Sequence, residues 1–253
     1  MNTKLKNFLD KLSYLFFPHD LSCIACAKDI QNFDTLPLCD KCKKEYYLDG
    51  KYCTVCNDIV YGSELICEKC QKHPKHFRRA VTPFVYKDAI ARQINGFKNR
   101  NHKYLKDAFA IAINAKLKEK NIDYDIITYM PISPTRLKQR GYNQAELIAK
   151  SLSKITGKPA MECLKKVRDT KEQKSLSFTL RQNNLKGAFE LVLKKEIKGK
   201  TILLIDDVIT TCASLDTASA ELLKSAKSVY CAGVARTILS VKKNSAFLAI
   251  QRK

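Results

Sequence analysis

The chain has 253 residues and a mass of 28.8 kDa, which allows a small module followed by one domain of ordinary size. Hydrophobic residues make up 45% of it, so a packed core is expected and wholesale disorder is excluded. With 46 Lys and Arg against 25 Asp and Glu, the formal net charge is +21, which excludes acidic, mucin-like and collagen-like proteins and favours partners that carry phosphate.

The N-terminal segment Met1–Phe17 carries apolar side chains at helical spacing. Asp10 and Lys11 interrupt this pattern and no small-residue cleavage site follows, so we expect an amphipathic helix packed on the protein rather than a signal peptide or a membrane anchor. No run of about eighteen uncharged apolar residues occurs in the chain. We therefore expect a cytoplasmic protein without a membrane-spanning helix.

Eight of the 11 cysteines form four Cys-x-x-Cys pairs in one stretch of the chain. Each pair places two thiolates on one tight turn, where both can bind the same tetrahedral zinc ion. Four such pairs predict two structural zinc sites, and nothing in the chain suggests the secretion that disulfides would require. The spacing leaves open whether successive pairs share a metal, as in a double zinc ribbon, or whether the pairing is crossed. The predicted ligands are Cys23, Cys26, Cys39, Cys42, Cys53, Cys56, Cys67 and Cys70.

The basic charge is unevenly distributed along the chain. Residues 1–79 hold 13 basic and 10 acidic side chains, whereas residues 80–253 hold 33 and 15. We therefore predict an N-terminal helix with a double zinc-ribbon module in residues 1–79, and a second, strongly basic domain in residues 80–253.

The second segment alternates short β-rich runs with helical patterns, which predicts an α/β domain with a mainly parallel sheet. One run, Ile202–Ile205, is apolar on both faces, as is typical of a central parallel strand. The expected strands are Ala80–Tyr86, Ile126–Met130, Cys163–Val167, Phe189–Leu193, Thr201–Ile205 and Val229–Ala235. The expected helices are Ala89–Phe97, Tyr104–Leu117, Asn143–Ile155 and Ser214–Ser225.

A basic loop follows the expected strand Ile126–Met130 and leads into a helix, which is where α/β sheets bind anionic ligands. Further on, the polar stretch Arg168–Arg181 has the length and placement of a mobile lid. Aromatic residues near the basic loops could stack on bases, although such residues more often lie in a core. They are Phe97, Tyr104 and Tyr142. The candidate nucleic-acid contacts are Lys98, Arg100, Lys103 and Arg140.

Two aspartates, Asp206 and Asp207, follow the buried run, and a hydroxyl-rich turn leads from them into a helix that opens near Ser214. Turn amides and a helix N-terminus suit a phosphate, and carboxylates at a strand end can bind ribose hydroxyls or a hydrated Mg²⁺. The alternative is an ordinary strand with an acidic helix cap. The stretch resembles the phosphoribosyl-diphosphate (PRPP) signature of type I phosphoribosyltransferases. It departs from that signature at Cys212, where the family usually has glycine and where a side chain could obstruct the phosphate.

The sequence Arg-Gly-Tyr-Asn-Gln-Ala-Glu at 140–146, the Asp-Asp-Val-Ile-Thr-Thr loop and the N-terminal Phe-Pro before the cysteine pairs are similar to the ComF family over nearly the whole chain. The resemblance implies a zinc-finger segment joined to a phosphoribosyltransferase-like domain, a role in handling incoming single-stranded DNA during natural transformation, and a helicase partner.

The same resemblance implies a role for each matching residue. The acidic pair would face the ribose, Ser133 and Arg136 would approach the diphosphate, and the lid would supply candidate catalytic residues. The implied 5′-phosphate ligands are Thr210, Thr211, Cys212, Ala213 and Ser214, and the catalytic candidates are Arg168 and Arg181. Thr210 stands where purine-salvage relatives have an acidic residue, and threonine is no general base at neutral pH, which counts against purine salvage.

Three functions remain to be distinguished. The first is a DNA-handling competence protein with a PRPP site, supported by the basic second segment. The second is a small-molecule phosphoribosyltransferase that transfers ribose 5-phosphate to a nitrogenous acceptor with Mg²⁺. The third is a protein-interaction module centred on the zinc ribbons.

Overall fold

The computed structural model describes residues 22–30, 36–60, 62–168 and 187–238. The expected N-terminal helix and most of the expected lid, including Arg181, lie outside these residues. None of the helices in the described part is long and apolar enough to cross a bilayer. The cysteine-rich segment contributes two short helices, α2 (Asp40–Tyr46) and α3 (Glu68–Lys72).

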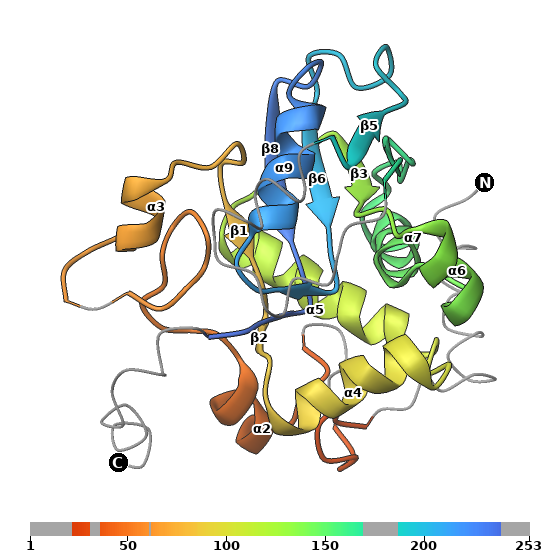
Figure 1. Ribbon diagram of the computed structural model, residues 1–253. Coiled ribbons are helices and arrows are strands. Elements are labelled where there is room, and N and C mark those ends of the chain that lie inside the picture. Colours follow the sequence, from red (N-terminus) through yellow and green to blue (C-terminus); the bar gives the residue numbers. More distant parts are fainter. Residues whose placement is uncertain (1–21, 31–35, 61, 169–186, 239–253) are drawn as a thin grey trace, which may run out of the picture.

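The rest of the described chain is an α/β domain built on a parallel sheet, as predicted (Figure 1). The strand order is β1-β8-β6-β3, and each neighbouring pair is parallel. The middle strand β6 has four consecutive buried residues after its first position, which explains its apolar sequence. The four strands are β1 (Ala80–Val81), β3 (Ile126–Tyr129), β6 (Thr201–Ile205) and β8 (Ser228–Ala232).

Each face of this sheet has its own core. Leu203 and Ile205 of β6 face one core, together with the helices α4, α5 and α7. Ile202 and Leu204 face the other core, together with α9 and the strands β4 (Leu164–Lys166) and β5 (Phe189–Leu191). Figure 1 shows α9 lying across β6 and β8. The helices are α4 (Asp88–Asn99), α5 (Leu105–Glu119), α6 (Pro134–Arg140), α7 (Gln144–Thr156) and α9 (Ala213–Leu222).

Two strands expected to be continuous are each broken in two, which corrects the sequence prediction. Ala80–Tyr86 divides into β1 and β2 (Phe84–Val85), and Val229–Ala235 divides into β8 and β9 (Ala235–Arg236). Pro83 lies between β1 and β2, and because it has no backbone N–H it cannot donate a hydrogen bond to a neighbouring strand. The second halves join β7 (Val208–Ile209) in a separate sheet of order β2-β9-β7. This small sheet lies beyond the carboxyl ends of the main strands.

A glycine makes the second break possible. A Cβ added to Gly233, between β8 and β9, would lie 2.8 Å from Cγ1 of Ile209 and 3.5 Å from the carbonyl oxygen of Asp206. The backbone after β8 therefore passes directly against the segment that follows β6. The remaining strands, β4 (Leu164–Lys166) and β5 (Phe189–Leu191), form an antiparallel pair.

Helix ends follow local sequence signals. The amide of Asn143 caps α7 by accepting from the backbone N–H of Ala145 at 3.0 Å, and Gly157 ends that helix in the left-handed conformation. The short helix α6 was not predicted, although Ser133 caps it and Pro134 is its first residue. Its seven residues carry no buried side chain, so its sequence has no apolar periodicity to recognise.

The predicted boundary near residue 79 stays a prediction, and several contacts cross it. The N–H of Arg78 donates to the carbonyl of Val229, so the chain already runs alongside β8 before β1 begins. Leu48 of the cysteine-rich segment donates to Pro83 O at 2.8 Å, and its carbonyl accepts from the buried ammonium of Lys116 on α5. The cysteine-rich segment is thus packed onto the α/β domain.

Candidate functional site

The eight predicted metal ligands form two four-cysteine clusters, and in each cluster all four Sγ atoms lie within 4.8 Å of one another. The Sγ–Sγ distance is 3.8 Å between Cys26 and Cys39 and 3.6 Å between Cys56 and Cys67. Four sulfurs at about 2.3 Å around a tetrahedral zinc ion would be about 3.8 Å apart, whereas a disulfide bond is about 2.05 Å long. Each cluster could therefore hold one zinc ion.

The clusters also answer the question of pairing that the spacing left open. One contains Cys23, Cys26, Cys39 and Cys42, and the other contains Cys53, Cys56, Cys67 and Cys70. Successive pairs share a site, as in a double zinc ribbon.

The two ribbons are an internal structural repeat, which the sequence analysis did not find. In each one, the residue after the first Cys-x-x-Cys is in the left-handed conformation, Ala27 at φ 59° and Asn57 at φ 61°. The second Cys-x-x-Cys of each ribbon begins a short helix, α2 or α3. Around the second cysteine pair the copies also match in sequence, with Leu-Cys-Asp-Lys-Cys-Lys-Lys at 38–44 and Ile-Cys-Glu-Lys-Cys-Gln-Lys at 66–72. This match is the sequence signal that could have revealed the repeat.

The acidic pair lies at the carboxyl end of the central strand β6. Because β3 and β6 run parallel with Tyr129 opposite Ile205, the loop after β3 reaches the same edge of the sheet. The N–H of Met130 donates to Ile205 O at 2.8 Å, which brings that loop directly beside Asp206. This edge is where open α/β sheets bind their ligands.

The two aspartates have different surroundings. Asp207 forms an ion pair with Lys98 of α4, with 3.0 Å between Oδ1 and Nζ. Asp206 accepts from the N–H of Asp207 at 2.8 Å. Burial, followed by the negative charge of Asp207, raises the pKa of Asp206 to about 7, against the lowering effects of that hydrogen bond and of Lys98. The pair can therefore take up or release a proton near neutral pH.

The turn after the acidic pair leads through β7 into α9. Thr210 is exposed, Thr211 and Ser214 are half-buried, and the backbone N–H groups of the first turn of α9 lie at the end of this loop. Hydroxyls and helix-end N–H groups are suitable donors for a phosphate. We refer to residues 206–214 as the phosphate loop.

The backbone of Cys212 is in the left-handed conformation, with φ 63° and ψ 4°. Glycine adopts this conformation most easily, which explains why a glycine is usual at this position. The side chain of Cys212 is nonetheless buried. Its Sγ accepts from the guanidinium of Arg236 at 3.4 Å and lies 3.9 Å from the carbonyl oxygen of Cys56. The thiol is therefore anchored against the second cysteine cluster, away from solvent.

The other predicted sugar-phosphate residues lie on several segments. Ser133 is buried, and its Oγ accepts from the N–H of Arg136 at 3.4 Å, while the Arg136 side chain is exposed on α6. Arg168 is exposed just after β4. Lys98, which stays a predicted nucleic-acid contact, forms an ion pair with Asp207, and sequence reasoning had not linked these two residues.

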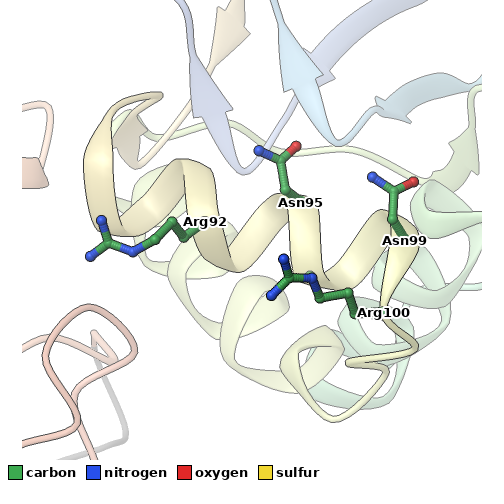
Figure 2. A pocket seen from close by; sticks show the side chains of 5 residues that line it. Arg92, Asn95, Asn99 and Arg100 are labelled. Atoms are coloured by element: carbon green, nitrogen blue, oxygen red, sulfur yellow. The ribbon is translucent and has the colours of Figure 1, made fainter.

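A polar stripe on α4 was also missed. Arg92, Asn95, Gly96, Asn99 and Arg100 line a pocket of about 390 Å³ along one face of the helix (Figure 2). Their spacing of three or four residues is the sequence signal that could have revealed it. Guanidinium and amide groups arranged in this way can donate to phosphates and to base edges.

Of the three aromatic candidates for base stacking, Phe97 and Tyr142 are buried in the core and contact each other. Tyr104 is 65% exposed and stacks on His102, with ring centroids 5.4 Å apart. Lys103 lies over the ring of Tyr142, with its Nζ 4.7 Å from the centroid. Arg140 donates to Gln144 at 3.2 Å and is half-buried.

Comparison with known proteins gave three informative relatives. Competence protein F of Haemophilus influenzae is 29% identical over 209 residues, which cover 80% of this chain and 90% of that protein. The DNA utilization protein YhgH of Escherichia coli is 27% identical over 180 residues, 69% of this chain and 78% of its own length. Competence protein ComFC of Bacillus subtilis is 22% identical over 227 residues, 83% of this chain and 91% of the relative.

No family model matches the chain. Among solved structures, the glutamine PRPP amidotransferase of B. subtilis overlaps 62% of this chain and 34% of its own, with 18% identity and a TM-score of 0.36. Over most of its length, the chain is similar to competence protein F, to ComFC and to YhgH, which confirms the resemblance to the ComF family inferred from its motifs.

Proposed function

We propose that this protein handles incoming single-stranded DNA during natural transformation and that its phosphate loop binds PRPP with Mg²⁺. The similarity to competence protein F and ComFC supports the first part. The observation that carries the second is the acidic pair at the carboxyl end of β6, followed by a hydroxyl-bearing turn and a helix N-terminus. We further expect a helicase partner, as the ComF resemblance implies, and a cytoplasmic location.

In this proposal the phosphate loop binds the sugar phosphate in two parts. Asp206 and Asp207 would accept hydrogen bonds from the ribose hydroxyls, and the turn from Thr210 to Ser214 would donate to the 5′-phosphate. Ser133 and Arg136, on the loop beside Asp206, would lie near the diphosphate. Mg²⁺ would bring the positive charge that neutralises the diphosphate oxygens.

Titration calorimetry tests this site directly. PRPP with Mg²⁺ should bind the wild-type chain, and Asp207→Asn should weaken binding at least tenfold, because it removes a charged acceptor. Asp123→Asn is a matched control, since the Asp123 side chain is 94% exposed and the residue precedes β3, at the opposite end of the parallel strands from the acidic pair. Failure of the wild-type chain to bind, or equal weakening by both variants, would contradict a PRPP site.

The proposed DNA surface is the polar stripe on α4 together with Lys103 and the exposed ring of Tyr104. Basic side chains would contact phosphates, and Tyr104 would stack on a base. In a fluorescence anisotropy titration with single-stranded DNA, the affinity should fall steeply as salt concentration rises. Binding that is insensitive to salt would contradict this proposal.

Substitutions locate that surface. Arg100→Gln and Lys103→Gln should each reduce the dependence of affinity on salt by about one counterion. Lys227→Gln makes the same change of charge just before β8, at the opposite end of the strands from the phosphate loop, and should leave DNA binding unchanged. Equal effects of all three substitutions would indicate binding through net charge alone.

The acidic pair favours a second function, transfer of ribose 5-phosphate from PRPP to a nitrogenous acceptor. Release of diphosphate in the presence of a panel of nucleobases distinguishes this enzyme from a PRPP-binding protein. Thr210 occupies the position at which purine-salvage relatives carry an acidic residue, so we expect no turnover with purine bases. Arg168 and Arg181 remain the candidate catalytic residues, and their substitution should reduce any turnover that is found.

A further inference from the structure

Arg236 joins the second cysteine cluster to the phosphate loop. This arginine is the last residue of β9 and is 2% exposed. One terminal nitrogen lies 3.8 Å from the Sγ of Cys56 and 3.4 Å from a carboxylate oxygen of Asp58. The other donates to the Sγ of Cys212 at 3.4 Å. A single buried guanidinium therefore contacts a cysteine of the second cluster and the left-handed residue of the phosphate loop.

A second connection runs through the segment that follows α3. Asp216, in the first turn of α9, is buried and accepts from the backbone N–H of His76 at 2.7 Å. Lys75 lies 3.8 Å from the other carboxylate oxygen. Cys53, Cys56 and Cys70 share one hydrophobic core with Ala213 and Leu215 of α9. The second ribbon thus contacts both the phosphate loop and the helix that begins from it.

The repeat provides an internal comparison. Where the second ribbon has Asn57 and Asp58, the first has Ala27 and Lys28. Asn57 donates to Thr82 at 2.9 Å, and Asp58 pairs with Arg236, so these two positions contact the α/β domain. Cysteines of the first ribbon instead pack in the core formed by α4, α5 and α7. The two ribbons therefore share a backbone and differ at the positions that contact the α/β domain.

We infer that metal in the second cluster holds the phosphate loop in its binding conformation through Arg236 and Cys212, so that metal occupancy and sugar-phosphate binding are coupled. This rests on the proposed sugar-phosphate site. A zinc ion bound by four thiolates carries a net charge of about −2, which Arg236 partly neutralises in a buried setting. Without the metal, Arg236 loses that partner and Cys212 loses the contact that stabilises its left-handed backbone. Coupling of this kind is reciprocal, so the ligand must also strengthen metal binding.

Two serine substitutions test the inference in the full-length, zinc-loaded chain. Cys67→Ser removes one ligand from the second cluster, and Cys26→Ser removes one from the first. Both cysteines are at least partly accessible, and neither is among the residues that contact Arg236. Each variant should retain one zinc per chain by metal analysis. Cys67→Ser should bind PRPP with Mg²⁺ about tenfold more weakly, while Cys26→Ser should bind as the wild type does.

A readout without ligand separates this inference from the proposed function. Hydrogen exchange of the backbone amides in residues 206–216 should accelerate in Cys67→Ser and not in Cys26→Ser. If the wild type does not bind PRPP, the proposed site fails, and the exchange result alone decides the inference. If both variants have the same affinity for PRPP and the same exchange in this segment, the inference is overturned.

Cys212→Gly tests the link itself while leaving all eight metal ligands in place. In the wild type, PRPP with Mg²⁺ should raise the zinc affinity of the second cluster by about tenfold in an equilibrium competition with a chelator, by reciprocity. In Cys212→Gly the glycine can adopt the same φ without a side-chain anchor, so this gain in zinc affinity should be lost while two zinc ions remain bound at the start. A gain of equal size in both proteins would show that Cys212 carries no coupling.

Discussion

Replacement of Asp206 by asparagine should stabilise the protein at neutral and alkaline pH, although it removes a proposed ligand contact. The pKa of Asp206 is raised to about 7 from its ordinary value of 3.8, first by burial and then by the charge of Asp207. Between these values the folded protein holds a proton that the unfolded chain has released. Stability of the wild type therefore falls as pH rises towards 7 and is constant above that pH. Asparagine has no proton to lose, so Asp206→Asn should not show this decline.

The expected size follows from the same shift. Each pH unit between the two pKa values corresponds to about 1.4 kcal/mol. An experiment between about pH 5.5 and pH 7 therefore covers roughly 1.5 units, or about 2 kcal/mol as an upper bound. Because the Asp206 side chain is only partly removed from solvent, we expect the stability difference between variant and wild type to grow by about 1 kcal/mol over this range.

Urea unfolding at several pH values between about 5.5 and 8.5, without ligand, measures this difference. Protonation of the cysteine clusters affects wild type and variant alike, so it cancels when the two are subtracted. Asp123→Asn controls for the change of net charge, because the Asp123 side chain is 94% exposed. A difference between Asp206→Asn and wild type that does not vary with pH would refute the reasoning.

Three further predictions concern packing and metal. Gly233→Ala should reduce the free energy of unfolding by about 1–3 kcal/mol in urea unfolding, because the new Cβ would lie 2.8 Å from Cγ1 of Ile209. Ile209→Ala removes that atom, so the double variant should lose less stability than the sum of the two single variants. Lys116→Met should lower the free energy of unfolding by about 1–3 kcal/mol in the same measurement, because the buried carbonyl of Leu48 loses its hydrogen-bond donor. Lys118→Met, on the exposed side of α5, is the control and should change the free energy of unfolding by less than about 0.5 kcal/mol. Metal analysis should find two zinc ions per chain, and their removal by a chelator should abolish protection of the cysteine-rich segment in hydrogen exchange.

The central part of the fold could be predicted from the sequence because its signals are local. The apolar run Ile202–Ile205 indicates a strand buried on both faces, and the acidic pair follows it directly. Asn143 and Gly157 mark the two ends of α7. The cysteine spacing predicted both clusters because four Cys-x-x-Cys pairs in one stretch of chain are typical of metal binding and of little else.

What the sequence did not reveal depends on contacts between distant segments. Asp207 pairs with Lys98 of α4, and nothing near either residue indicates the other. Arg236 is the last residue of the short strand β9 and resembles any basic residue at a strand end, although it contacts Cys56, 180 positions earlier. The sequence marks Cys212 as unusual for its position, but the direction of its side chain follows from contacts with Arg236 and the second ribbon.

The strand order also has a consequence for synthesis of the protein. β1 directly follows the ribbons, yet its sheet partner is β8, with Ala80 opposite Cys231. A ribosome that releases the chain from its N-terminus delivers both cysteine clusters long before β6, β8 and Arg236. The ribbons can bind metal while the sheet between β1 and β3 still lacks its two central strands, and such long-range pairing is slow to form. Zinc supply during translation would then affect the yield of folded protein before any ligand is encountered.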